Sequence, residues 1–256
     1  MTASADYFAP EGLRTRGTVI VVPGRGETPA TYARFGSRLA YDAYRVRVIG
    51  PPAGAPDVTA FLKEVAQSLS AAVDGVAGGT PDGLPRPLVL AGSDLGAAAV
   101  AALLRRPDPE AAWWPGAAVL AGLPGPGARA DGDWDAELDV RSHCPVHRGV
   151  LSADASLQRG ALAEALHDEL LDAAYAEVAD LPQLLLVGDR DPLADRPALE
   201  RTAKALPQGR LTVVHGAYHD VLNDQQHRSV AAEVISFLET LRNQLVPVLA
   251  VGTSAW

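Results

Sequence analysis

Short runs of apolar residues recur along the chain, and most are followed by a stretch with helical periodicity. The apolar runs are rich in Val, Leu and Ile and cover residues 18–23, 44–50, 87–92, 116–122, 183–189 and 210–216. Most are apolar on both faces, which is typical of buried parallel strands. Helical patterns cover residues 30–42, 58–76, 95–106, 196–206 and 225–243. This alternation predicts an α/β protein with a mostly parallel sheet and helices on both faces.

One long interval, residues 124–181, interrupts the alternation. It opens with the Pro/Gly/Asp-rich stretch PGPGARADGDWD and continues with short helical patterns such as LAEALHDELLDAAYAEVAD. A long insertion between a strand and the next strand is usually functional or disordered, and the helical patterns favour the first. We therefore predict a single domain over residues 1–256, with residues 124–181 forming a short helical cap over the site.

The sharpest turn signal follows the third apolar run, at Gly92-Ser93-Asp94-Leu95-Gly96. Ligands of a parallel α/β sheet bind outside the carboxyl ends of its strands, so residues at such turns are candidates for chemistry. Small residues two positions on either side of Asp94 allow a tight strand-to-helix turn. A carboxylate at a helix N-terminus is stabilised in its charged form. Helix capping is the structural alternative for Asp94, because Asp is a favoured N-cap residue.

Acidic residues and a histidine follow the last two predicted strands. Asp191 lies in the loop after residues 183–189, with Asp189 as a nearby competitor, and His219 precedes the final helix. The chain order is therefore elbow residue, acid and histidine, which is the order of the catalytic residues in α/β-hydrolases.

These motifs resemble the α/β-hydrolase superfamily, and most of all its lysophospholipase and monoacylglycerol-lipase-like branch. PGRGE followed by TPATYARFGSRLA is similar to the oxyanion turn and its helix, GDRDPLAD to the acid loop, and GAYHDVLND to the histidine loop. The resemblance implies an α/β-hydrolase fold, with Asp191 orienting the base His219 and with the backbone N–H groups of Arg25 and Leu95 forming the oxyanion hole. Pro23 replaces the usual histidine of the turn, and an aspartate stands at the nucleophile position.

The nucleophile position falls on Asp94 when the family pattern V-x-G-x-S-x-G is aligned on VLAGSDLGA. An esterase that uses Ser93 is an alternative, but it would put the bulky Leu95 where the turn needs a small residue. Asp at this position resembles haloalkane dehalogenases and epoxide hydrolases. A carboxylate can displace a leaving group from an sp³ carbon, and His219 can then activate the water that hydrolyses the resulting ester.

Leu95 and the PGRGE turn depart from the signatures of those two families. Two other functions therefore remain open. One is lyase, isomerase or cyclase chemistry with Asp94 and His219 as an acid/base pair, and the other is a non-catalytic small-molecule binding protein of the same fold.

The predicted cap contains the cluster RSHCPVHR, residues 141–148. His143, Cys144 and His147 have the side chains of zinc ligands, but only three such groups are local. We therefore predict no metal and no cofactor. His143 and His147, together with Tyr175 and with Tyr218 beside the candidate base, are possible substrate contacts.

Composition restricts the class of partner. The chain has 256 residues, of which 48% are hydrophobic, and a net charge of −9, which disfavours binding to nucleic acid. A single cysteine excludes an intrachain disulfide, and we see neither a signal-peptide pattern nor a bilayer-length apolar run. These features predict a cytoplasmic protein that acts on a small, mostly apolar molecule. They leave the oligomeric state open.

Overall fold

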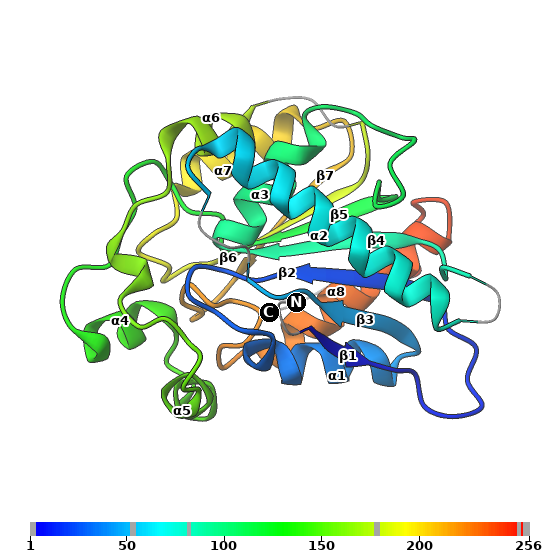
Figure 1. The fold of residues 1–256 in the computed structure, drawn as a ribbon, viewed down its shortest axis with the longest axis horizontal. Coiled ribbons are helices and arrows are strands. Elements are labelled where there is room, and N and C mark those ends of the chain that lie inside the picture. The colour runs from blue at the N-terminus through cyan, green and yellow to red at the C-terminus, as the bar shows by residue number, and fades with distance from the viewer. Residues whose placement is uncertain (1–3, 52–54, 81–82, 177–179, 250–251, 253–256) are drawn as a thin grey trace.

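The computed structural model describes residues 4–51, 55–80, 83–176, 180–249 and 252. Its strands are β1 (Ala5–Tyr7), β2 (Gly17–Val22), β3 (Tyr44–Val48), β4 (Leu88–Ser93), β5 (Ala117–Ala121), β6 (Gln183–Gly188) and β7 (Gly209–Val214). Within these residues the strands form one sheet in the order β1-β3-β2-β4-β5-β6-β7 (Figure 1). β1 is antiparallel to β3, and every other pair is parallel. The predicted parallel sheet is confirmed, with β1 as an additional short edge strand.

The helices cover both faces of this sheet, as predicted. They are η1 (Pro29–Tyr32), α1 (Ala33–Tyr41), α2 (Val58–Gly78), α3 (Leu95–Leu104), α4 (Trp134–Arg141), α5 (Pro145–Ala153), η2 (Ala161–Ala163), α6 (Asp168–Tyr175), α7 (Arg196–Ala205) and α8 (His227–Arg242). α1 and α8 pack on one face, and α2, α3, α6 and α7 pack on the other (Figure 1). Across the ranges described above, every helix is too short or too polar to cross a bilayer.

Alternating side chains of the central strands fill two separate cores. In β2, Val19 and Val21 pack with α1 and α8, whereas Ile20 and Val22 pack with α2 and α3. All four side chains are fully buried, because successive residues of a strand point to opposite faces of the sheet. This double burial explains why the strands read as continuous apolar runs.

Three aspartates mark where helices begin. Asp57, Asp133 and Asp195 each accept a hydrogen bond from the backbone N–H three residues later, at 2.7, 3.1 and 3.0 Å. Each carboxylate thereby satisfies one of the free N–H groups of α2, α4 and α7.

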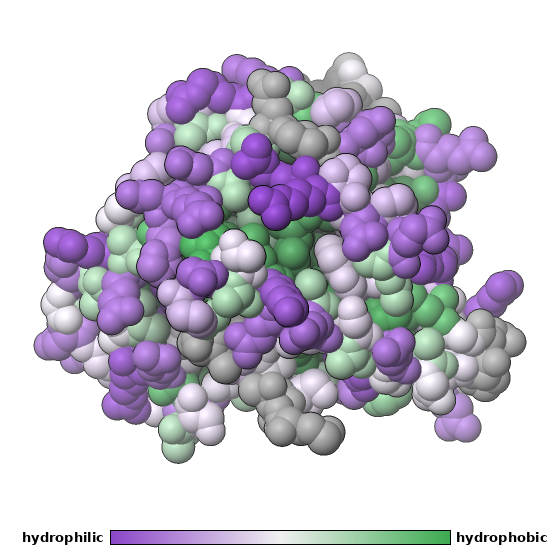
Figure 2. All heavy atoms as spheres, turned by 45° about the horizontal axis from the view of Figure 1, so that its top comes forward, coloured by the Kyte–Doolittle hydropathy of each residue, from purple (hydrophilic) through white to green (hydrophobic). Residues whose placement is uncertain are grey.

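The segment between β5 and β6 carries α4, α5, η2 and α6. α6 packs on α3, whereas α4 and α5 extend beyond the edge of the sheet on the left of Figure 1. The amide of Gln158 donates to the carbonyl oxygen of Gly26 at 2.9 Å, and the amide of Ala130 donates to Leu162 at 2.7 Å. The first bond holds the insertion on the turn that follows β2, and the second joins two parts of the insertion to each other. In Figure 2 the top of Figure 1 is turned towards the viewer. On this face hydrophilic residues surround a hollow in which apolar residues are visible.

Candidate active site

Asp94 occupies the sharp turn between β4 and α3. Its φ of 48° and ψ of −114° lie where residues with a Cβ are uncommon. Its amide donates to the carbonyl of Ala121 at 3.0 Å, and its own carbonyl accepts from the amide of Ala98 at 3.0 Å. The side chain makes no capping hydrogen bond to α3. The capping role considered for Asp94 from the sequence is therefore wrong, and its carboxylate is directed elsewhere.

Two glycines make this turn sterically possible. A Cβ on Gly92 would lie 2.3 Å from the carbonyl oxygen of Gly96, and a Cβ on Gly96 would lie 2.1 Å from that of Val22. Both atoms belong to backbone, so no side-chain rotation relieves the overlap. The spacing of small residues around Asp94 thus follows from the close approach of β2, β4 and α3.

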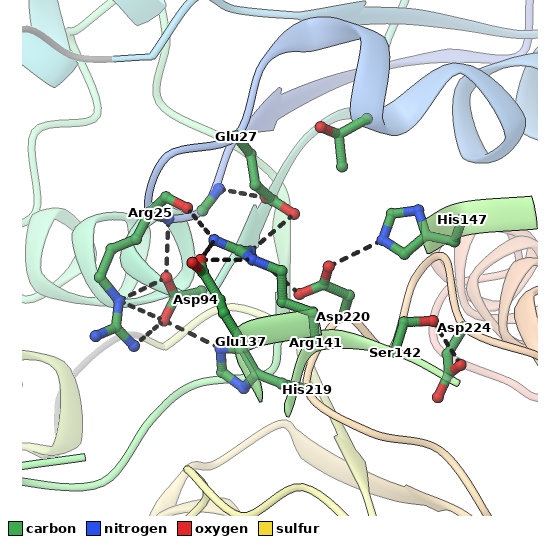
Figure 3. A network of polar contacts seen from close by, with 12 residues as sticks. Arg25, Glu27, Asp94, Glu137, Arg141, Ser142, His147, His219, Asp220 and Asp224 are labelled. Atoms are coloured by element: carbon green, nitrogen blue, oxygen red, sulfur yellow. Dashed lines mark hydrogen bonds and ion pairs between the residues drawn. The ribbon is translucent and has the colours of Figure 1, made fainter. Parts of the chain in front are cut away.

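His219 lies between two carboxylates, and Figure 3 shows the one of Asp94. Its Nδ1 atom is 3.0 Å from Oδ2 of Asp191, and its Nε2 atom is 3.2 Å from Oδ1 of Asp94, although the second pair is not aligned for a hydrogen bond. Asp189, the competing acid, instead contacts Nδ1 of His215 at 3.0 Å. The loops after β4, β6 and β7 therefore bring Asp94, Asp191 and His219 into one chain of contacts.

The Arg25 side chain folds over the carboxylate of Asp94 (Figure 3). Its Nε donates to Oδ2 at 2.9 Å and its Nη2 to Oδ1 at 2.8 Å, and the Arg25 backbone N–H also reaches Oδ2 at 2.8 Å. The remaining nitrogen, Nη1, donates to the backbone carbonyl oxygens of Glu164 and Ala128 in the insertion. The side chains of Arg25 and Asp94 are both buried, with exposures of 6% and 3%.

Neighbouring charges determine the protonation states of His219 and Asp94. Burial opposes the charged form of His219, but Asp191 and Asp94 outweigh it and raise the pKa of the imidazole to about 10. Burial also opposes the charged form of Asp94, yet Arg25 and His219 hold the pKa of that carboxyl well below its usual range. At neutral pH His219 therefore carries its second proton, and Asp94 is ionised.

A second buried network, centred on Arg141 of α4, adjoins the oxyanion turn (Figure 3). The Nη2 of Arg141 donates to the carbonyl oxygen of Arg25 at 2.7 Å, and its Nε donates to Oε1 of Glu137 at 3.0 Å. Its Nη1 lies 3.5 Å from Oδ1 of Asp220 and 3.8 Å from Oε1 of Glu27. Arg141 is fully buried, so it anchors the insertion and does not reach a substrate.

Glu27 of the PGRGE turn faces this network. It accepts hydrogen bonds from the Gly24 amide, at 2.8 Å, and from the hydroxyl of Tyr32. Burial, and then repulsion by Asp220, raise the pKa of Glu27 to about 7 although Arg141 opposes the shift. The carboxylate thus fixes the turn that presents the Arg25 amide to Asp94.

A cavity of about 630 Å³ lies beside the turn, between α2, α3 and the insertion. Its wall includes Arg25, Val58, Phe61, Leu95, Leu166 and Leu170. Asp94 and His219 are not part of that wall, and they are only 2% and 1% exposed. Since Arg25 touches both the cavity and Asp94, its side chain separates the carboxylate from the space that a ligand would fill.

The four predicted substrate contacts lie away from this wall. The ring of His143 stacks on Tyr218 with centroids 3.9 Å apart, and Nε2 of His147 binds Asp220 at 2.9 Å. Tyr175 donates to a backbone carbonyl of the segment after β5. Among the residues that the structure describes, no three His, Cys, Asp or Glu side chains are grouped to hold a metal ion.

Ser93 is the last residue of β4 and pairs in register with Ala121 of β5. It is 3% exposed, and its hydroxyl lies against Tyr32 on the side of η1. Asp94, one residue later, occupies the turn itself. This geometry argues against an esterase that uses Ser93.

Sequence reasoning missed the Arg25 side chain and the Arg141 network. Arg25 entered the prediction only through its backbone N–H. The i,i+4 spacing of Glu137 and Arg141 on one helix is a signal for an ion pair, but it does not say that the pair is buried. Glu27 lay within the quoted turn motif, yet Asp220, the carboxylate that shares Arg141 with it, comes from the far end of the chain.

Comparison with known proteins agrees with the α/β architecture. The family model described as serine aminopeptidase, S33 (Hydrolase_4) matches residues 14–226. A search of curated proteins finds no match. Among solved structures, monoglyceride lipase from Saccharomyces cerevisiae is 15% identical, covers 93% of this chain and 91% of its own, and has a TM-score of 0.72. Monoacylglycerol lipase from Paleococcus ferrophilus is 17% identical, with coverages of 93% and 98% and a TM-score of 0.70.

MenH from S. aureus, at 14% identity, has coverages of 95% and 100% and a TM-score of 0.61. These structural likenesses define the class: the protein has the α/β-hydrolase fold. The match over residues 14–226 goes further, and the chain belongs to the Hydrolase_4 (serine aminopeptidase, S33) family of hydrolases.

Proposed function

We propose that the protein hydrolyses a small, mostly apolar substrate through an alkyl ester formed on Asp94. The observation that carries this proposal is the way the two oxygens of the carboxylate are used. Oδ2 accepts the Arg25 backbone N–H, and Oδ1 lies 3.2 Å from Nε2 of His219. An aspartate nucleophile needs this arrangement, because one oxygen attacks while the other becomes the oxyanion of the later tetrahedral intermediate.

In the first step, Oδ1 of Asp94 attacks an sp³ carbon of the substrate. A carbon–oxygen bond forms, and the bond to a halide or to an epoxide oxygen breaks with its electron pair. A halide leaves to solvent as its anion, and His219 releases its proton to solvent in a separate step, whereas an epoxide oxygen takes the proton of His219 itself. The products are a neutral ester of Asp94 and a neutral imidazole.

Loss of the Asp94 charge prepares His219 for the second step. The raised pKa of His219 depends on two carboxylates, and esterification removes one of them. The neutral imidazole, oriented by Asp191, then accepts a proton from water, whose oxygen attacks Cγ of Asp94. The N–H groups of Arg25 and Leu95 stabilise the oxyanion. Collapse releases the alcohol with the second water proton and restores the carboxylate beside the imidazolium.

The insertion, residues 124–181, serves as the cap in this proposal. The cavity wall combines apolar side chains from α2, α3 and α6, and the buried network around Arg141 ties the cap to the turn that carries Arg25. The apolar side chains of this wall favour small substrates with an alkyl portion.

Trapping of the ester tests the proposal. The His219→Ala variant is incubated with 1-bromobutane, 1,2-epoxybutane and 5-bromopentanoate, and the peptide that contains Asp94 is analysed by mass spectrometry. We expect one added substrate group on Asp94, and no addition in the His219→Ala, Asp94→Asn double variant. Full turnover of any of these substrates by Asp94→Asn alone would contradict the proposal.

Isotope labelling separates hydrolysis from lyase, isomerase or cyclase chemistry. In a single turnover in ¹⁸O water, hydrolysis places one heavy oxygen in the carboxylate of Asp94, because water attacks Cγ. An acid/base reaction that uses Asp94 and His219 leaves the aspartate unlabelled. The protonated state of His219 already disfavours a role for it as a base beside a charged Asp94.

A second candidate function is ligand binding without turnover. The observation in its favour is the bidentate Arg25–Asp94 pair, which leaves the carboxylate 2% exposed and outside the cavity wall. Ligand binding to the wild type, with neither ester nor label on Asp94 for any compound that binds, would establish this alternative.

A further inference from the structure

We propose that Arg25 is a gate opened by the substrate, and that the substrate is a small organic carboxylate with an apolar chain. Its carboxylate replaces that of Asp94 on the Arg25 guanidinium and so exposes the nucleophile. This inference rests on the proposed function, because it names the substrate class of the same site.

The position of Arg25 is the first support. Arg25 borders the cavity, while Asp94 and His219 do not. Attack on any substrate carbon therefore requires the guanidinium to leave the carboxylate of Asp94. The gate is a single side chain, and its backbone N–H can stay in place on Oδ2.

Charge is the second support. The other hydrogen-bond partners of the guanidinium are the neutral carbonyl oxygens of Glu164 and Ala128, so Asp94 is the one carboxylate bound to it in the described structure. If a neutral ligand displaced Asp94, it would leave a buried cation without a counter-charge, which is strongly unfavourable. A ligand carboxylate keeps the cation paired, while His219 continues to balance Asp94.

Geometry is the third support. Nε and Nη2 of Arg25 grip both oxygens of Asp94 at 2.9 and 2.8 Å, which is the planar fork that suits a carboxylate. The wall also includes apolar residues such as Val58, Phe61 and Leu170, together with the polar or charged residues Gln158, Arg159 and His167. Two carboxylates, Asp57 and Glu164, also border the cavity, but Asp57 caps α2 and Glu164 is exposed. The cavity thus pairs one buried cation with a partly apolar wall, and the second arginine of that wall, Arg159, is exposed.

Binding of a matched pair of unreactive probes, pentanoate and pentanamide, tests the gate by titration calorimetry. A hydrogen-bonded charge pair is worth more than a neutral contact, so we expect the wild type to prefer pentanoate by about tenfold or more. Arg25→Gln should abolish the preference, and Arg106→Gln, which removes an exposed charge at the far end of α3, should retain it. Equal binding of the two probes to the wild type would overturn the proposal.

Asp94→Asn gives a second test that does not depend on a folded Arg25 variant. Removal of the competing carboxylate leaves the guanidinium without its partner, so pentanoate should bind more tightly than to the wild type, again by about tenfold. Unchanged or weaker binding would contradict the gate. Both measurements detect binding and require no turnover. A preference for pentanoate without an ester on Asp94 would support the gate and contradict the proposed function. An ester on Asp94 without that preference would do the reverse.

Discussion

The Nη2 atom of Arg141 donates a hydrogen bond to the carbonyl oxygen of Arg25 over 2.7 Å, so a buried cation of the insertion holds the turn whose amide faces Asp94. The same guanidinium balances the carboxylates of Glu137, Asp220 and Glu27. The contact links the packing of α4 to the geometry of the candidate oxyanion hole.

Replacement of Arg141 by Met should destabilise the protein by about 3–5 kcal/mol, because it leaves buried carboxylates without their cation. Arg148→Met is the matched control. Arg148 also binds an acid of α4, Asp139, but that pair is exposed and should contribute little to stability. Urea unfolding of both variants measures the difference. A loss for Arg141→Met that is small and no larger than that for Arg148→Met would contradict a stabilising role of the Arg141 network.

The unfolding free energy should fall as pH rises from about 6.5 towards 10, because folded His219 keeps its proton over that range while the unfolded chain loses it. The raised pKa therefore stabilises the fold below pH 6.5, and that contribution is lost as pH passes 10. One proton gives a slope of at most about 1.4 kcal/mol per pH unit.

Denaturant titrations between pH 7.5 and 9.5, for the wild type and for His219→Gln, check this slope. The range lies above the pKa of about 7 of Glu27, so Glu27 adds little to it. Identical pH dependence in the two proteins would rule out a stabilising imidazolium.

Asp191→Asn should lower the pKa of His219, because burial already opposes the imidazolium and one of its two balancing carboxylates is removed. The control is Asp189→Asn, which affects a carboxylate paired with His215 and not with His219. Titration of the His219 ring by NMR measures both. A larger shift in the Asp189 variant would mean that the acid loop is arranged differently in solution.

Gly96→Ala should destabilise the protein by about 3 kcal/mol or more, since the new Cβ would overlap the backbone oxygen of Val22 at 2.1 Å. Gly149→Ala, in α5, is the matched control, because no atom lies within 4 Å of its Cβ and Ala favours a helix by up to about 1 kcal/mol. Thermal unfolding should therefore shift in opposite directions. A similar melting temperature for both variants would show that the elbow is not tightly packed.

Much of the fold was predictable, because strands buried on both faces leave a direct trace in the sequence. Residues 87–92 were predicted as a strand, and β4 covers Leu88–Ser93. β1 was not predicted, because three residues at an edge carry too little pattern and its pairing partner, β3, lies about forty residues away.

The part of the candidate site that lies at the strand ends was predictable, because chain order and sheet topology decide which of these residues lie close together. Asp94, Asp191 and His219 follow three parallel strands, whose carboxyl ends share one edge of the sheet. Their roles in a reaction remain proposals. The four predicted substrate contacts do not line the cavity. The path of an irregular insertion is set by packing and not by a periodic pattern, so the sequence does not predict which of its residues reach the cavity.

The sequence by itself determined the parallel sheet, the tight turn at Asp94 and the order of acid and histidine, because these depend on local periodicity and on small residues at fixed spacing. Only the tertiary structure decided that Asp94 does not cap its helix, that Arg25 covers its carboxylate, and that Arg141 is buried among Glu27, Glu137 and Asp220. Those facts depend on where long charged side chains meet after residues far apart in the chain have packed together. No local pattern encodes such a meeting.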